Sequence, residues 1–291
     1  MTPEIFAQSI INGLFVGGIY ALVSIGLTMI YGVMKIINFA HGEFLMIGMY
    51  VAFWAFSIAG IHPYLSVFLS MIFLFLTGVI IQRVLVDKVI SAPVLNQVLL
   101  LLGLSTFLVG LAQMFFTADP RTIILPFSLE RYRIGALIFN KPRTIAFVVS
   151  MVIAAALFLF LKYSKTGKAI RACSISREEA SVVGINVKKV YQLTLCIGAA
   201  VTGVAGALLI PSYPVTPTIG VSFSTIAFVV VVLGSMGNFL GAFVGGLIIG
   251  VAETLGGFFI SSDLKIVVSM VIFILVLLFK PQGLFGKARL S

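Results

Sequence analysis

Residues 38–43 read Asn-Phe-Ala-His-Gly-Glu, and this polar stretch separates two runs, residues 5–34 and 44–82, that contain no Lys, Arg, Asp or Glu. Each run exceeds the roughly 20 apolar residues with which a helix crosses the hydrocarbon core of a membrane. A histidine and a carboxylate between such runs lie at or within the membrane boundary, where an ionisable group is costly unless it faces protein or water. The stretch therefore predicts membrane-spanning helices and marks a candidate functional site between them.

The composition of the whole chain supports this class. Hydrophobic residues make up 60% of the 291 residues, charged residues only 10%, and the mean hydropathy is +1.20. A soluble domain carries about 25% charged residues, and a transmembrane β-barrel shows short segments of alternating hydrophobicity. We predict an all-α fold, a polytopic membrane helical bundle that forms one transmembrane domain over residues 1–291.

Neither the positive charge nor the two cysteines indicate a nucleic-acid-binding protein or a metal or redox protein. The net charge is +10, but the basic residues lie in short loops between apolar runs, which is typical of membrane topology and not of nucleic-acid binding. Cys173 and Cys196 lack the spacing of a metal or redox motif. We predict neither a catalytic site nor a metal site or cofactor within this chain.

The apolar runs predict eight or nine hydrophobic elements. The seventh is short and ends in Gly-Ser-Met-Gly-Asn at residues 234–238, so it is either a full crossing or a broken, re-entrant helix. The runs are 6–28, 37–60, 64–82, 97–117, 144–161, 190–210, 221–236, 239–260 and 264–279.

The distribution of Lys and Arg predicts the orientation. With nine crossings and residues 162–189 in the cytoplasm, 13 of the 19 basic residues lie inside, Lys287 and Arg289 among them, and six lie outside. The positive-inside rule favours this arrangement, with the N-terminus outside and the C-terminus in the cytoplasm. It makes residues 118–143 a long external loop.

The cytoplasmic loop 162–189 contains a helix signal. Ser176 and Glu179 have the spacing of a capping box, and Gly184 is a good helix C-terminal residue. We predict a short helix from about Arg177 to Val183. A short exposed helix suits a groove on another protein, although a solvated linker helix has the same pattern.

Small residues at four-residue spacing, such as Gly13 and Gly17 or Gly237, Gly241 and Gly245, predict close helix packing within the bundle.

The ionisable and amide side chains inside apolar runs are the candidates for a translocation path or gate. Asn38 is a good N-cap for the following helix, so a buried hydrogen-bonded network and a direct role in the pathway remain equal alternatives for the opening stretch. His41 and Glu43 are two residues apart and do not share a helix face. Glu253 lies in a charge-free stretch and faces a cavity, a partner group or the outer interface. Asn238-Phe239 echoes Asn38-Phe39 at the start of a second apolar run.

Motifs along nearly the whole chain resemble those of the permeases of ABC importers for branched-chain amino acids, the LivH type. Two positions depart from the usual family pattern, because Lys280 stands where Arg is common and Ser235 where a second glycine is common. The motifs are Asn12–Gly13, Gly18–Leu22, Gly26–Gly32, Ile37–Glu43, Thr166–Ala172, Gly184–Asn186, Val232–Asn238 and Lys280–Gly286.

The resemblance implies a transport system in a bacterial-type plasma (inner) membrane. Two related permeases, either a paralogous subunit or a second copy, form the membrane core, two ATPase subunits hold ATP-Mg beneath it, and an extracellular or periplasmic binding protein delivers the substrate. A separate ATPase agrees with the sequence, because Gly167-Lys168 lacks the rest of a phosphate loop. The loop 118–143 would lie near the binding protein. The positions that match the coupling element of the family are Arg171, Glu178, Glu179, Ala180 and Gly184.

Three further functions stay open at this point. Relatives of the same family carry urea or short amides. A proton-coupled secondary transporter would use Glu43, His41 and Glu253 as a relay. An assembly subunit without transport of its own is the third alternative.

Overall fold

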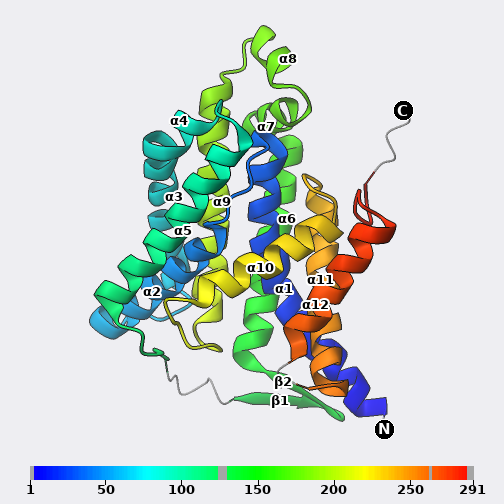
Figure 1. The fold of residues 1–291 in the computed structure, drawn as a ribbon. Helices are drawn as coiled ribbons and strands as arrows, with labels where there is room; N and C mark the ends of the chain where they lie inside the picture. Colours follow the sequence, from blue (N-terminus) through cyan, green and yellow to red (C-terminus); the bar gives the residue numbers. More distant parts are fainter. Residues whose placement is uncertain (1–2, 124–129, 262–263, 287–291) are drawn as a thin grey trace.

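The computed structural model describes residues 3–123, 130–261 and 264–286 (Figure 1). Part of the predicted external loop, residues 124–129, lies outside the described residues, as do the basic residues Lys287 and Arg289.

Each of the nine predicted apolar runs coincides with a helix, which confirms the polytopic bundle. Among the described residues, seven helices are long and apolar enough to cross a membrane, when α3 is counted with the π-helical turn η1 (Gln82–Val86) and α4 (Asp87–Val89) that extend it. The helices α10 and α12 are shorter, with 15 residues each, or about 22 Å. The bounds are α1 Pro3–Met34, α2 His41–Ala59, α3 Ser66–Ile81, α5 Val94–Phe116, α6 Lys141–Tyr163, α9 Val187–Leu209, α10 Ile219–Leu233, α11 Phe239–Phe259 and α12 Lys265–Phe279.

The helix α1 is the central element of the bundle and packs closely on α11. A Cβ atom added to Gly13 would lie 2.6 Å from the Cα atom of Val251, and one added to Gly17 would lie 2.9 Å from the carbonyl oxygen of Gly246. Only glycine lets the two backbones approach this closely. Packing through small residues, as predicted for Gly13 and Gly17, is therefore confirmed.

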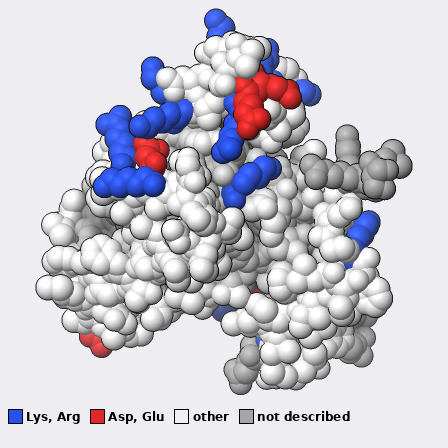
Figure 2. Space-filling view, turned by 45° about the horizontal axis from the view of Figure 1, so that its top comes forward, with Lys and Arg blue, Asp and Glu red and all other residues white. Residues whose placement is uncertain are grey.

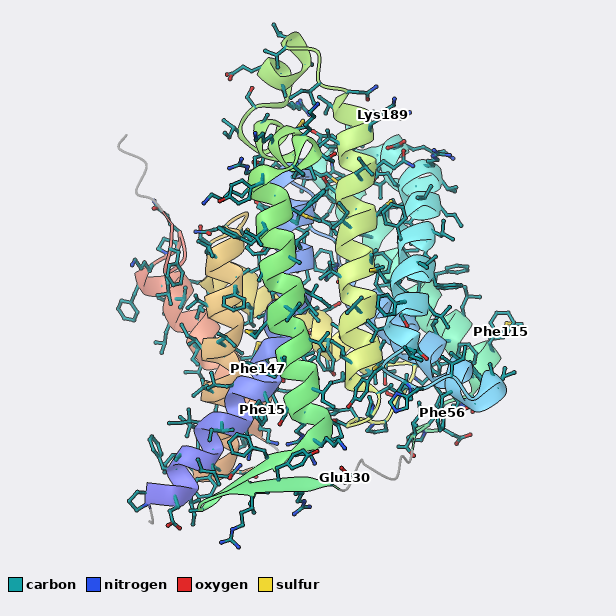
Figure 3. The ribbon with its side chains drawn as sticks, turned by 180° about the vertical axis from the view of Figure 1, so that it is seen from behind. Phe15, Phe56, Phe115, Glu130, Phe147 and Lys189 are labelled. Atoms are coloured by element: carbon teal, nitrogen blue, oxygen red, sulfur yellow. The ribbon has the colours of Figure 1, made fainter. Side chains whose placement is uncertain are left out.

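The helix α6 covers another side of α1 (Figure 3). The rings of Phe15 on α1 and Phe147 on α6 lie 5.6 Å apart between centroids. The same Phe147 ring fills the space above Gly18, where a Cβ atom would lie 2.7 Å from it.

The helix α2 begins inside the bundle and not at its end. The chain leaves α1 through Lys35, whose φ of 57° is left-handed, and returns so that His41 lies beside Val23 and Gly26. That position is about two to three turns back from the end of α1. The start of α10 meets the start of α2 there, with Gly220 against Gly42. Both helices run obliquely across the more upright α6 and α9 (Figure 1).

The helix α10 corresponds to the short seventh run, residues 221–236, that the sequence predicts. It begins in the interior and ends beside the last turn of the described chain, where Leu284 N–H donates to the carbonyl of Leu233 over 2.7 Å. Its length of about 22 Å is less than the roughly 30 Å hydrocarbon core. Interrupted helices of this kind are typical of transporters.

The two ends of the bundle differ in charge and structure. One end carries α7 (Lys165–Ile175) and α8 (Arg177–Val182), over which Lys and Arg side chains gather (Figure 2). The opposite end carries the N-terminus and a hairpin of β1 (Arg131–Ile134) and β2 (Leu137–Asn140) (Figure 1).

The hairpin lies within residues 118–143, where the sequence predicts only a long loop. Arg131 pairs with Asn140 and Ile134 with Leu137, around Gly135 with a φ of 62°. Two side chains of α1 contact the hairpin. Gln8 accepts from Ile138 N–H over 2.7 Å and donates to the Ile138 carbonyl over 2.8 Å, and the Phe15 ring lies 6.1 Å from the Phe139 ring between centroids. This docking site is distant in sequence, so local pattern did not reveal it.

Candidate functional site

His41 joins three helices in the interior. Its Nε2 lies 3.0 Å from the carbonyl oxygen of Val23 on α1 and 2.8 Å from Oγ1 of Thr202 on α9, and the side chain is fully buried. Oγ1 of Thr202 also donates to the carbonyl of Gly198. A protonated Nε2 supplies a single N–H, which the Val23 carbonyl and the Thr202 hydroxyl share as acceptors, so the imidazole ties α2 to α1 and α9.

Asn38 is not the N-cap of α2, contrary to the prediction. Its Oδ1 accepts a hydrogen bond from Ala40 N–H over 3.2 Å, and Ala40 occupies the cap position without a side-chain bond. The first turn of α2 is capped from another helix instead, because Gly42 N–H donates to Oγ of Ser224 on α10 over 2.8 Å. The same Oγ donates to the carbonyl of Phe39. Ser224 thereby fixes the meeting point of α2 and α10.

Glu43 faces away from His41, as the two-residue spacing predicts. Its Oε1 accepts from Oγ of Ser105 on α5 over 2.8 Å. The carboxylate lines a cavity of ≈ 260 Å³ between α2, α5, α10 and α12. His41 and Glu43 therefore belong to different hydrogen-bonded groups.

Glu253 forms the second interior polar group. It is 5% exposed, and its Oε2 accepts from Oη of Tyr20 on α1 over 2.7 Å while its Oε1 accepts from Oγ of Ser269 on α12. The group joins α1, α11 and α12. It also faces a cavity of ≈ 220 Å³ in the half of the bundle nearer the hairpin.

Asn238 lies apart from these groups. It is the N-cap of α11, where its Oδ1 accepts from Gly241 N–H over 3.1 Å, and its Nδ2 donates to the carbonyl of Phe285. Fifteen residues of helix separate it from Glu253, about 22 Å. The two Asn-Phe sequences also differ in their bonds, because Oδ1 of Asn238 caps α11 whereas Oδ1 of Asn38 accepts from Ala40 N–H before α2.

Sequence reasoning missed the partners Tyr20, Ser105, Thr202, Ser224 and Ser269. Hydroxyl residues are common in membrane helices, where many bond to a carbonyl of their own helix. The apolar pattern around them gave no signal that these five contact the candidate residues.

The short helix predicted from about Arg177 to Val183 is confirmed as α8, and a second helix precedes it. Oγ of Ser176 accepts from Glu179 N–H over 3.2 Å at the start of α8, and Gly184 has a φ of 85° after its end. The preceding helix α7 was not predicted; it begins at the N-cap Ser164. Arg171, a predicted coupling residue, donates from Nη2 to the carbonyl of Lys162 and holds α7 against the end of α6.

The tip formed by α8 and the residue after it exposes apolar side chains. Ala180 is buried, whereas Val182 is 86% and Val183 75% exposed. Glu178 and Glu179 are also exposed. An exposed apolar tip with acidic neighbours suits a groove on another protein.

Replacing Ser176 by Ala is expected to loosen α8 without affecting the bundle. The loss of the N-cap bond costs about 1 kcal/mol. Hydrogen exchange of the amides of residues 177–183 should speed up. The control is Ser174→Ala, since the Ser174 hydroxyl donates to the Arg171 carbonyl within α7. In this control the same amides should exchange as in the parent. Equal protection of these amides in the two variants would contradict the capping role.

Comparisons with known proteins agree with the fold. Residues 9–277 match the family model described as the permease component of the branched-chain amino acid transport system. The chain is 36% identical to the high-affinity branched-chain amino acid transport permease BraD of Pseudomonas aeruginosa over an alignment of 304 positions, which covers 99% of each chain. It is 36% identical to LivH of Escherichia coli K12, over 98% of this chain and 97% of the relative. It is 26% identical to the probable LivH of Methanocaldococcus jannaschii, over 98% and 95%. No solved structure shows a significant match.

Proposed function

This chain belongs to the family of branched-chain amino acid transport permeases, and from that membership we propose that it forms the membrane pathway of an ABC importer for aliphatic branched-chain amino acids. The observation that carries the proposal is the 36% identity along nearly the whole length to permeases named for this transport. The interior starts of α2 and α10 fit a pathway that opens alternately to either side.

The proposed complex contains four kinds of partner. Two ATPase subunits hold ATP-Mg, because the chain has no phosphate loop of its own. They bind at the end of the bundle that carries α7 and α8. A substrate-binding protein docks at the end that carries the hairpin. A paralogous permease or a second copy completes the core, and lipid surrounds it. The N-terminus then lies outside and the C-terminus in the cytoplasm, in line with the positive-inside rule.

The proton-coupled alternative receives no support from the interior groups. Glu43 bonds to Ser105, while Glu253 bonds to Tyr20 and Ser269. His41 bonds to neither carboxylate, since its Nε2 faces Val23 and Thr202. The side chains that would form a relay thus lie in three separate groups.

Reconstitution tests the proposed function. The permease with its permease and ATPase partners in liposomes should accumulate leucine, isoleucine and valine when loaded binding protein is outside and ATP inside. An ATPase variant without its phosphate-loop lysine should abolish the uptake, because hydrolysis drives it. Accumulation driven by a proton gradient without ATP, or transport of urea in preference to leucine, would overturn the proposal.

A further inference from the structure

The cavity beside Glu253 has the size of a small-molecule site. Its volume is ≈ 220 Å³, somewhat below the roughly 300–1,000 Å³ of pockets for drug-sized ligands. It lies between α1, α6, α9, α10, α11 and α12, in the half of the bundle nearer the hairpin. It has room for one molecule of amino-acid size.

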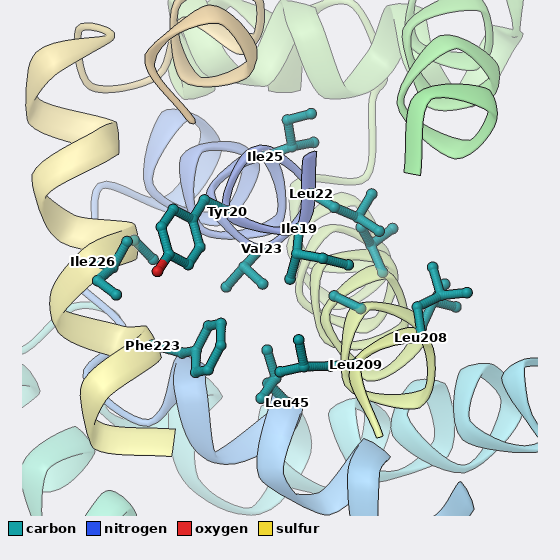
Figure 4. Packing of buried hydrophobic residues seen from close by; sticks show 14 of the residues in the cluster. Ile19, Tyr20, Leu22, Val23, Ile25, Leu45, Leu208, Leu209, Phe223 and Ile226 are labelled. Carbon is teal, nitrogen blue, oxygen red and sulfur yellow. The ribbon is translucent and has the colours of Figure 1, made fainter. Parts of the chain in front are cut away.

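Apolar side chains form most of its wall. Ile19 on α1, Leu209 on α9, and Phe223 and Ile226 on α10 line the cavity. Phe223 and Ile226 lie beside the Tyr20 ring (Figure 4). The Tyr20 and Phe223 rings meet edge to face, with centroids 5.9 Å apart. This wall offers a branched aliphatic group the burial that gives apolar recognition its free energy.

A carboxylate with unused acceptor capacity stands at one side of the cavity. Tyr20 and Ser269 each donate one hydrogen bond to Glu253, and a carboxylate accepts about four. Two hydroxyls from neighbouring helices therefore fix the orientation of Glu253 and leave lone pairs for a donor in the cavity. Oη of Tyr20, which donates to Glu253, keeps its own lone pairs for the same donor.

Two cations line the same cavity near the hairpin end. Arg143 stands in the first turn of α6, and its guanidinium carbon lies 6.0 Å from the centroid of the Tyr213 ring. Lys265 is the first residue of α12, and its alkyl chain lies along Gly257, where a Cβ atom would be 2.6 Å from Lys265 Cε. Both side chains line the cavity together with Glu253.

We propose that this cavity binds one aliphatic α-amino acid as a zwitterion. The ammonium group donates to Glu253 and Tyr20, the carboxylate faces Arg143 and Lys265, and the side chain lies against Ile19, Leu209, Phe223 and Ile226. The assignment rests on the proposed transport function and adds where, and in which orientation, the permease holds its substrate. A neutral amide or urea would give no charged partner to Glu253, Arg143 or Lys265. In a confined site, this strongly disfavours such ligands.

Protection of a cysteine from labelling tests the site on the purified permease–ATPase complex. Ser222 is exposed and lines the cavity, so a Ser222→Cys variant should react with a water-soluble maleimide. The native thiols of this chain give little background, because Cys173 is 4% and Cys196 1% exposed, and burial raises the pKa of the Cys173 thiol. Ser57, exposed near the end of α2 and absent from the cavity lining, gives the matched control Ser57→Cys.

Leucine should slow the labelling at position 222 and leave the labelling at position 57 unchanged. Isoamylamine, which lacks the carboxylate, and 4-methylpentanoate, which lacks the ammonium group, should each protect only at about 10- to 100-fold higher concentration, because each loses a charge-assisted contact. Added to Ser222→Cys, Glu253→Gln should weaken protection by leucine in the same range while leaving that by 4-methylpentanoate unchanged. Lys265→Gln should also weaken protection by leucine, and it should leave protection by isoamylamine unchanged.

The outcomes separate the site from the function. Lys265 is exposed at the start of a helix, so Lys265→Gln keeps the test valid even if Glu253→Gln fails to fold. ATP-driven leucine uptake together with equal labelling at position 222 with and without leucine would overturn the cavity assignment and leave the transport function standing. Protection that is equal for leucine and urea would also overturn it. Loss of ATP-driven uptake in the parent complex would overturn the function itself.

Discussion

Replacing Gly42 by Val is expected to destabilise the bundle strongly. A Cβ atom on Gly42 would overlap the carbonyl oxygen of Gly220 and lie 2.7 Å from the backbone nitrogen of Ser224. Both neighbours are backbone atoms in the first turns of α10, so no side-chain rotation relieves the clash. Overpacking commonly costs about 1–3 kcal/mol, and separating the helices would also break the bond from Gly42 N–H to Ser224.

Thermal unfolding of the detergent-solubilised protein, followed by size-exclusion chromatography, measures this effect. Gly42→Val should lower the midpoint by several degrees or eliminate the monodisperse peak. The control is Gly103→Val on α5, where a Cβ atom meets nothing within 4 Å, and its midpoint should stay near that of the parent. If the two variants unfold at the same temperature, the contact between the starts of α2 and α10 is not what positions them.

Introducing Asp at both Val182 and Val183 is expected to abolish ATP-driven uptake while the bundle stays folded. These side chains are 86% and 75% exposed at the tip of α8, and burying a valine in a partner groove contributes about 1.5–3 kcal/mol. Losing two such contacts and placing two carboxylates there weakens docking by at least about 100-fold. Co-purification of the ATPase subunits and uptake should fall together.

The control for this variant carries the same kind of change at the other end of the bundle. Ile58 is 79% exposed near the end of α2, so Ile58→Asp introduces a charge on an exposed apolar side chain without touching α8. It should retain the ATPase subunits. If the Val182/Val183 variant retained the ATPase subunits and showed full uptake, α8 would not be the coupling element.

Local features of the sequence determined that this is a membrane protein and where several of its helices begin, end and pack. The uncharged runs 5–34 and 44–82 require membrane burial, since no other environment accepts so much apolar surface without charge. Glycine spacing at Gly13 and Gly17 predicted close packing, because only a residue without a side chain permits that approach. The cap at Ser176 and the left-handed Gly184 were readable because both act on neighbouring residues of the chain.

Only the tertiary structure decided which polar groups meet. The hydrogen bond from Tyr20 to Glu253 joins residues 233 positions apart, and that between His41 and Thr202 joins residues 161 apart. An apolar helix presents similar residues on all sides, so its pattern does not say which face turns toward which neighbour. The cap of α2 shows the same limit, because Asn38 satisfies its local backbone while Ser224 of a distant helix supplies the bond to Gly42. Local hydrogen bonding and hydrophobicity are properties of the sequence by itself, whereas the position of α2 and α10 in the interior and the shape of the cavity at Glu253 depend on backbone contacts that exist only after the helices pack.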